Sequence, residues 1–361
     1  MAYTTIDKPE DYFNTKLYTG TGSTQSITGV GFQADMIWNK NRSSSGYHHH
    51  IIDSVRGVSK LLRVSSNIAE FTSADSITSL DSDGFTIGAD ANSYVNANTD
   101  NQVTWSWKAG GTASSNTDGD ITSSVSVNTT AGFSIGTYTG SGTDGDTVGT
   151  GLTGLSVVIA KCRNASGGWV VKHQSLSGDN NVYFQVTNAA GSAASAGAGG
   201  IGALNDSTFP LVTGTSGASS SQVNASGNTH VFYAFAEKKG YSKFGSYVAS
   251  GDATDANFIY LGFKPSWVMF KKTSGADNWL ILDNKRSSSS GKNLVDFHLR
   301  ANLSNAESDL SGTDNGVDFL SNGIKLRKNN GEFNASGGTY IYMAFAENPF
   351  VTSTGIPTTA R

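Results

Sequence analysis

The chain has 361 residues and a formal net charge of −4, with only 15% charged residues and 43 glycines. This length allows two or three domains that each bury a core, and the charge balance excludes a strongly basic surface for a nucleic-acid partner. Scarce charge combined with 18 Phe and 13 Tyr is typical of an all-β protein with many turns.

The sequence lacks the cysteines for a disulfide or a Cys-based metal site, and it lacks segments for secretion or membrane insertion. Cys162 is the only cysteine, which excludes an intrachain disulfide and a Cys-based metal site. The first residues lack the basic and apolar regions of a secretory signal, and no apolar run approaches about 18 residues. We therefore expect synthesis in a host cytoplasm without a signal peptide, and no insertion into a membrane.

The chain repeats one pattern three times, most clearly near the end of each copy. Residues 224–237 (NASGNTHVFYAFAE) and 334–347 (NASGGTYIYMAFAE) align without a gap, and residues 96–107 are a more divergent version. Self-similarity of this kind is the signature of a repeat architecture. We predict three copies of about 110 residues, at residues 1–111, 131–240 and 241–350.

Each copy is predicted to contain short strands in the same order. A strand and turn come first, at residues 17–22, 137–142 and 246–251. A second strand follows a Gly-apolar pair and leads to Lys40, Lys161 or Lys271. A hairpin comes next, with loops at residues 41–46, 163–168 and 273–278 and return strands at 48–53, 169–173 and 279–283.

The last strand of each copy has an apolar residue at every second position, as in Val231, Tyr233 and Phe235. This period of two indicates a half-buried strand, although residues 231–236 and 341–346 are apolar enough to be covered on both faces. Short strands separated by turns favour an antiparallel β-sandwich in each copy, jelly-roll or lectin-like, with an open barrel as the alternative.

The segments outside the copies differ in composition. Residues 112–130 are polar and weakly patterned, which predicts a linker that sets the first copy apart. The second and third copies meet at Gly240 and Tyr241 without a spacer, so we expect them to pack together. Residues 351–361 are predicted to form an extended C-terminal tail, and the first 13 residues an attachment segment.

Patterns that match catalytic signatures lack the context that their chemistry needs. Gly-x-Gly-x-x-Gly occurs at residues 140–145, 149–154 and 197–202, but none opens a helix that could hold a phosphate. Gly-x-Ser-x-Gly at residues 132–136 lies inside a predicted strand. Asp-rich turns at residues 81–84, 118–120 and 144–146 lack the bidentate Glu of a calcium loop. We predict no catalytic residue, no cofactor and no metal site.

His48, His49 and His50 form the most conspicuous cluster, and only the first copy has it. Consecutive residues of a strand point to opposite faces, so only His48 and His50 can share one, and two imidazoles alone make a weak metal site. We interpret the triplet as a solvated strand or a contact between subunits, with metal binding and a response to pH as alternatives.

Several motifs resemble a family of repeat proteins carried by marine bacteriophages, including cyanophages. They are residues 1–7 (MAYTTID), 11–20 (DYFNTKLYTG), 81–86 (DSDGFT), 131–135 (AGFSI), 243–247 (KFGSY) and 333–340 (FNASGGTY). The resemblance covers almost the whole chain. It implies a structural, tail-fibre-like protein of the virion and supplies no catalytic residues.

Two non-enzymatic functions follow. The first is a tail-fibre-like adhesin that contacts a host cell-surface glycan, with Tyr47, His48, His49, Trp169 and Trp279 as candidate ligand-binding residues. In the alternative interpretation, each of the two tryptophans anchors its return strand in the core. The second function is a capsid decoration or knob protein bound to the head. A glycan-degrading enzyme is a third alternative, but no acid pair is identifiable.

The expected partners follow from the same interpretation. They are other virion proteins and further copies of the chain, in a homo-oligomer for which a trimer is favoured.

Overall fold

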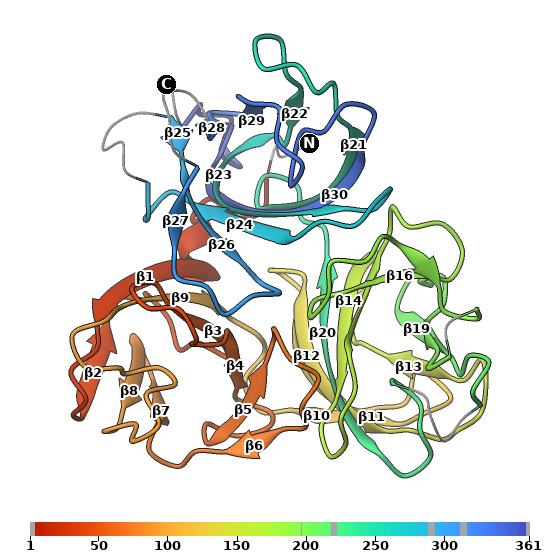
Figure 1. Ribbon diagram of the computed structural model, residues 1–361. Coiled ribbons are helices and arrows are strands. Elements are labelled where there is room, and N and C mark those ends of the chain that lie inside the picture. Colours follow the sequence, from red (N-terminus) through yellow and green to blue (C-terminus); the bar gives the residue numbers. More distant parts are fainter. Residues whose placement is uncertain (1–3, 196, 218–221, 288–292, 311–315, 359–361) are drawn as a thin grey trace.

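The computed structural model describes residues 4–195, 197–217, 222–287, 293–310 and 316–358. This part of the chain is all-β, as predicted, and its strands form several antiparallel sheets (Figure 1). Its only helical element is the 3-10 turn η1 (Pro9–Asp11). No helix within these residues is long and apolar enough to span a membrane.

Each copy contributes one larger and one smaller sheet. In the first copy the larger sheet contains, in spatial order, β1 (Phe13–Thr19), β9 (Asn101–Trp107), β3 (Met36–Asn41), β4 (His50–Asp53), β5 (Lys60–Arg63) and β6 (Phe71–Thr72). The smaller sheet contains β2 (Gln25–Thr28), β8 (Gly84–Ile87) and β7 (Ile77–Asp81).

The second copy has the same strand order with two additional strands at one edge. Its larger sheet contains β10 (Ser114–Asn116), β11 (Ser123–Asn128), β12 (Phe133–Thr139), β20 (Thr229–Ala236), β14 (Leu155–Cys162), β15 (Trp169–His173), β16 (Asn180–Tyr183) and β17 (Gly191–Ser192). The smaller sheet contains β13 (Thr147–Gly149), β19 (Thr208–Val212) and β18 (Gly200–Ile201).

The third copy repeats the order of the first. Its larger sheet contains β21 (Ser242–Val248), β30 (Thr339–Pro349), β23 (Phe263–Lys272), β24 (Trp279–Asp283), β26 (Phe297–Arg300) and β27 (Ser308–Asp309). The smaller sheet contains β22 (Phe258–Tyr260), β29 (Gly323–Leu326), β28 (Val317–Leu320) and β25 (Leu294–Val295).

Both faces of the larger sheets are covered, as the apolar runs predict. Successive residues of a strand point to opposite faces. On one face of the second copy's sheet, Val158 and Phe232 pack with Phe209 of the smaller sheet. Ile159 and Tyr233 face the other way, into a core that all three copies share. Every residue of β14 is therefore buried.

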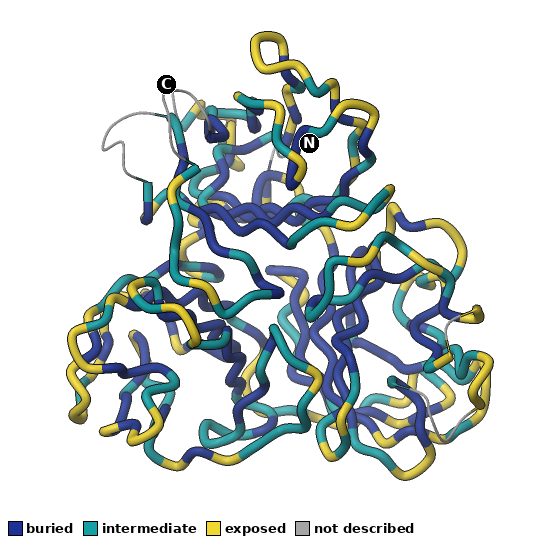
Figure 2. The backbone as a smooth tube through the Cα atoms, in the orientation of Figure 1, coloured by how far each residue is buried: buried dark blue, intermediate teal, exposed yellow. Residues whose placement is uncertain are grey.

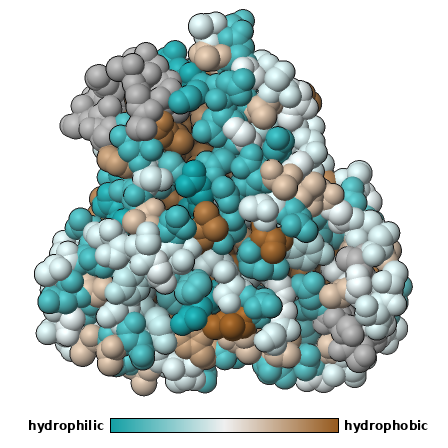
Figure 3. Space-filling view, viewed as in Figure 1, coloured by the Kyte–Doolittle hydropathy of each residue, from teal (hydrophilic) through white to brown (hydrophobic). Residues whose placement is uncertain are grey.

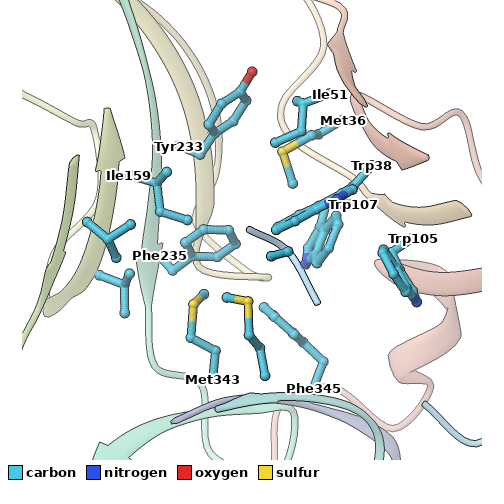
Figure 4. Close-up of a cluster of buried hydrophobic side chains, with 14 of the residues drawn as sticks. Met36, Trp38, Ile51, Trp105, Trp107, Ile159, Tyr233, Phe235, Met343 and Phe345 are labelled. Carbon is cyan, nitrogen blue, oxygen red and sulfur yellow. The ribbon is translucent and has the colours of Figure 1, made fainter. Parts of the chain in front are cut away.

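The inner faces of the three larger sheets meet in one apolar core (Figure 4). This central core contains every tryptophan of the chain: Trp38, Trp105, Trp107, Trp169, Trp267 and Trp279. The ring of Trp107 lies 5.9 Å from that of Trp267 in the third copy and 6.5 Å from that of Phe235 in the second. Exposed residues are mainly in the peripheral loops (Figure 2). The expectation that the first copy stands apart is therefore wrong.

Three equivalent lysines connect the copies in a cycle. All three are buried, and each Nζ donates to a backbone carbonyl of a different copy. The pairs are Lys40 to Ser304 at 3.4 Å, Lys161 to Asn67 at 3.2 Å and Lys271 to Thr187 at 2.8 Å. Burial lowers the pKa of Lys40 to about 7 and that of Lys161 and Lys271 to about 8. Carbonyl oxygens are thus the partners of these ammonium groups at every seam.

An ion-pair network also joins the first copy to the second. The buried Arg56 donates to Asp53 at 2.5 Å and to Glu70 at 2.9 Å, within its own copy. Arg163 of the second copy donates to the same Glu70 from two nitrogens, both at 3.0 Å. The Tyr233 hydroxyl donates to Asp53 at 2.6 Å. Burial opposes ionisation of Glu70, but hydrogen bonds from the two arginines lower its pKa overall.

The same network recurs between the third copy and the first. Arg286 donates to Asp283 at 2.6 Å and to Glu307 at 2.7 Å. Arg42 of the first copy donates to Glu307 at 2.6 Å, and Trp105 Nε1 donates to Asp283 at 2.9 Å. No covalent connection crosses this seam, so these bonds and the shared core close the ring of copies.

Among the described residues, the remaining seam, between the second and third copies, does not contain this network. By strand register, His173 and Leu176 occupy the places that Asp and Arg take in the other two copies. Backbone bonds replace the ion pairs here, including Ala190 N to Thr273 O at 3.0 Å. The chain itself crosses this seam at Gly240, as the absence of a spacer predicts.

Residues 112–130 do not form the predicted linker. Strands β10 and β11 extend the larger sheet of the second copy, with Val125 opposite Gly136 of β12. Ile121 and Val125 are buried in the core between that copy's two sheets. A short strand with few apolar residues among Ser, Thr and Asn has the composition of a linker, and its pairing with β12 was not evident from composition.

The ends of the chain pack on their own fold. Ile6 is buried in the central core, and η1 contacts β30. Asp7 accepts a hydrogen bond from the backbone nitrogen of Ser353 at 2.7 Å. The predicted N-terminal attachment segment is therefore held, from Thr4 onward, by this chain. Its first three residues lie outside the described part.

A buried asparagine holds two loops together in each copy: Asn96, Asn224 and Asn334. In the second copy, Asn224 Oδ1 accepts hydrogen bonds from the backbone nitrogens of Ser141 at 3.0 Å and Gly142 at 3.3 Å. Its Nδ2 donates to Thr143 O at 2.7 Å. The buried amide therefore supplies both a donor and an acceptor to backbone groups of the neighbouring loop.

Asn224→Ala is expected to lower the free energy of unfolding by about 1–3 kcal/mol, because the substitution removes three hydrogen bonds between the loops and each such bond typically contributes about 0.5–1.5 kcal/mol. Urea unfolding followed by tryptophan fluorescence measures the loss. Ser226→Ala is the control, since Ser226 is exposed in the same turn and should leave stability unchanged. Equal stability of the two variants would contradict a role for the amide in holding the loops.

Candidate functional site

A pocket lies at each seam, beside the end of the last strand of a copy. The pocket next to Lys108 has a volume of about 480 Å³, the one next to Glu237 about 410 Å³, and the one next to Glu347 about 270 Å³. Ligand sites commonly have volumes of about 300–1,000 Å³. The pocket next to Glu237 differs from the other two because exposed aromatic side chains line it.

We call this site the Tyr260 pocket. Its lining includes Glu237, Lys243, Tyr260, Gly262, Phe350 and Val351. The pocket thus lies where the chain passes from the second copy to the third, between the ends of β20, β21, β22 and β30. Tyr260 is 58% exposed and Phe350 36%.

Charged groups stand beside the aromatic surface. Lys243 Nζ lies 5.8 Å from the centroid of the Tyr260 ring, a geometry in which the ammonium is attracted to the ring face. Glu237 Oε2 accepts a hydrogen bond from the backbone nitrogen of Phe244 at 3.3 Å, which directs the carboxylate toward β21. The pocket therefore offers an aromatic face, a cationic donor and an anionic acceptor together.

The exposed large apolar side chains of the described residues all lie in the third copy and its tail. They are Val248, Phe258, Tyr260, Phe350 and Ile356. The face shown in Figure 3 is mostly polar or neutral, with only small separate hydrophobic spots. Concentration of exposed apolar groups in one region marks a candidate binding surface.

A polar groove of about 630 Å³ lies between the first and second copies. Ser65, Asn67 and Gln185 line it with hydroxyl and amide groups. Ser65 Oγ is 2.8 Å from His48 Nδ1. Within the described residues, no group of three or more His, Cys, Asp or Glu side chains is placed to hold a metal ion.

A family model described as a domain of unknown function, DUF7483, matches residues 8–349. The chain belongs to this family. The matched region includes all three copies and the core that they share. Comparison with curated proteins gave no match, and comparison with solved structures gave none.

Two of the predicted ligand-binding residues of this DUF7483 protein are inaccessible. Trp169 is fully buried and Trp279 is 2% exposed, both in the central core. Trp169 Nε1 donates to Arg63 O at 2.7 Å, and Trp279 Nε1 donates to Tyr183 O at 2.9 Å. Each indole thus binds the neighbouring copy, so the prediction that these tryptophans contact a glycan is wrong. The alternative, that each anchors its return strand, is what the structure shows.

The histidine triplet is not a solvated strand. His49 lies in the central core, where Trp38 Nε1 donates to its Nδ1 at 3.0 Å, and it cannot contact a ligand. His50 is also buried, with its ring 5.2 Å from that of Tyr94. Burial lowers the pKa of His50 to about 3. Tyr47 and His48 are half-buried. They lie on the first copy, whereas the Tyr260 pocket joins the second and third.

The sequence-based prediction did not include the residues of the Tyr260 pocket, because residue type alone favours tryptophan as a binding aromatic and does not show which aromatic side chains are exposed. The pattern that could have indicated this site is the sequence Phe258-Ile259-Tyr260. In a strand it places the two aromatic rings on one face and the aliphatic residue on the other. A strand in this pattern normally turns its largest apolar residues inward. Here the structure buries Ile259 and exposes both rings.

Proposed function

We propose that the DUF7483 chain consists of three tandem β-sandwich copies and is a non-enzymatic structural protein of a bacteriophage virion. In this proposal it is displayed on the particle surface and takes part in tail-fibre-like adhesion to the host. Support comes from the phage-type motifs along the chain, which include residues 81–86, 243–247 and 333–340.

The observation that carries the adhesive role is the Tyr260 pocket. Many of the large aromatic side chains pack inside the fold, including all six tryptophans in the central core. Tyr260 and Phe350 instead remain exposed around a pocket of about 410 Å³. Holding apolar groups in water has a cost that a binding partner removes. A surface for contact outside the chain explains why they are there.

The ring of copies suits a displayed module. Two seams contain buried ion-pair networks, the third is crossed by the chain, and the central core unites all three. Such a body can hold its surface loops in fixed positions. We propose other virion proteins as its attachment partners, and self-association, with a trimer favoured, as its state on the particle.

Immunogold electron microscopy of the particle tests this proposal, together with competition by the purified chain for adsorption to host cells. We expect label on the tail and slower phage adsorption when the chain is in excess. Label distributed over the head with unchanged adsorption would instead support capsid decoration. Particles that carry no label would overturn both assignments.

A further inference from the structure

We infer that the Tyr260 pocket binds a sugar unit of a cell-surface polysaccharide, with the sugar ring stacked on Tyr260 and its hydroxyls bonded by Lys243 and Glu237. This inference rests on the proposed adhesive function and names the ligand class of that site. It is carried by the chemistry of the pocket and by a comparison between the copies.

The aromatic groups form a platform. Phe258 and Tyr260 are two residues apart on β22, which is an edge strand of the smaller sheet, and they are 46% and 58% exposed. Ile259 between them is 6% exposed and packs in the core. The two side chains therefore leave the strand on one outer face, from backbone positions about 7 Å apart. Flat aromatic faces of this kind suit the apolar C–H face of a pyranose.

The charged groups decide between a sugar and a wholly apolar partner. Lys243 Nζ is 5.8 Å from the Tyr260 ring centroid, and Glu237 lines the same pocket. Covering an ammonium and a carboxylate with an apolar surface removes water without replacing its hydrogen bonds, which is unfavourable. The rim of a sugar ring carries hydroxyls that both donate and accept. A sugar unit therefore satisfies the aromatic face and the charged groups at once.

The backbone beneath the platform is fixed before any ligand binds. The nitrogens of Leu261 and Gly262 both donate to Asn322 O, at 2.9 and 3.1 Å. Gly262 has φ of 81°, in the left-handed region that favours glycine, and its carbonyl accepts from Phe350 N at 3.2 Å. This bond links Phe350 to the turn that follows Tyr260. Preorganisation of the platform reduces the entropy lost on binding.

Comparison of the first and third copies shows that the first copy lacks the aromatic pair. Tyr260 pairs with Gly323 in the third copy, and Thr28 pairs with Gly84 at the same register in the first. By the same register, Ser26 of the first copy corresponds to Phe258. The smaller sheet thus forms equally well with Ser and Thr at these two positions, so folding does not require the aromatic pair of the third copy.

The test uses the whole chain and two matched variants. Tyr260→Thr introduces the residue that the first copy has at this register. Val248→Thr is the control: Val248 is about as exposed as Tyr260 and lies outside the pocket lining. Thr19 occupies the same register position in the first copy, so this variant also introduces the residue of the first copy. Saturation-transfer NMR with methyl glycosides, neutral hexosides in one set and methyl glucuronide in the other, measures binding. Direct adsorption of the labelled purified chain to host cells is measured in parallel.

We expect saturation transfer from at least one glycoside, weakened about tenfold in affinity by Tyr260→Thr and unchanged by Val248→Thr. A signal from methyl glucuronide alone would assign the binding to an acidic sugar held by Lys243. Absence of transfer from every glycoside, or equal transfer in the Tyr260→Thr variant, would overturn the inference. If the chain still adsorbs to host cells when the sugar inference fails, the proposed adhesive function remains supported. If the unmodified chain does not adsorb at all, the adhesive function itself is overturned.

Discussion

Asp283→Ala is expected to lower the free energy of unfolding by about 3–5 kcal/mol, the typical cost of leaving a buried charge without its partner. Asp283 and Arg286 are both fully buried and 2.6 Å apart. Removal of the carboxylate also leaves Trp105 Nε1, from the first copy, without its acceptor. The loss should therefore appear at the seam between the third and first copies, which no covalent connection crosses.

Urea unfolding followed by tryptophan fluorescence measures this loss. All six tryptophans lie in the central core, so the signal reports separation of the copies. Asp255→Ala is the control. The Asp255 side chain is 95% exposed, and its Oδ1 lies 3.7 Å from Lys325 Nζ, so the substitution should not change the free energy of unfolding measurably. The double variant Asp283→Ala/Arg286→Leu should recover part of the stability, since Leu176 occupies this place in the second copy. A single variant as stable as the control would show that the network does not hold the seam.

The repeat and the strand order could be predicted because they depend on local pattern. Alternation in Val231, Tyr233 and Phe235 identifies a strand wherever the chain places it, and the run 231–236 correctly indicated that both faces are covered. The alternation does not show which parts of the chain cover each face of the strand. One face packs on a smaller sheet of the same copy, and the other packs on copies more than a hundred residues away.

Charged residues were the least predictable part of the fold. Arg56 and Glu70 are residue types typical of a surface, yet both are largely removed from water, Arg56 by pairs within the first copy and Glu70 also by its pair with Arg163 across the seam. A signal was present: the Asp53-x-x-Arg56 spacing recurs at Asp283-x-x-Arg286, and a Glu follows 14 residues after the first arginine and 21 residues after the second. Recurrence of a charged triad in two of three copies indicates a shared structural role, which a reading of each charge by itself does not show.

The candidate site was harder still, because accessibility is a tertiary property. Trp169 and Tyr260 are both aromatic residues at the end of a short strand in the sequence. Only the assembled fold distinguishes them: the first faces the central core, and the second lies on an edge strand and is 58% exposed. Residue type suggested the tryptophans, whereas position in the sheet selects Tyr260.

Acidification from pH 7 to 4 is expected to unfold the chain, because its buried histidines are held neutral. Burial lowers the pKa of all six histidines below the ordinary 6.5, and five of them are buried. The pKa is about 3 for His50 and about 4 for His173, His230 and His298, and that of His49 is also well below 6.5.

The sign of the effect follows from these shifts. Between pH 6.5 and 4 the unfolded chain binds protons at these sites and the folded chain does not, so stability falls as the pH falls. A histidine with a pKa of about 4 withdraws about 3 kcal/mol over that interval, at about 1.4 kcal/mol per pKa unit. Domains are usually stable by about 5–15 kcal/mol, so several such groups together are enough to unfold the chain at about pH 5.

Tryptophan fluorescence and circular dichroism during an acid titration measure the transition. His230→Gln is the sharpest variant, because Gln102 occupies the equivalent register in the first copy, opposite Tyr18 as His230 is opposite Tyr138. It removes one buried titrating group and should move the midpoint to lower pH. His48→Gln, at a half-buried site, should move it less. A chain that stays folded at pH 4, or a midpoint that His230→Gln leaves unchanged, would show that the buried imidazoles do not control acid stability.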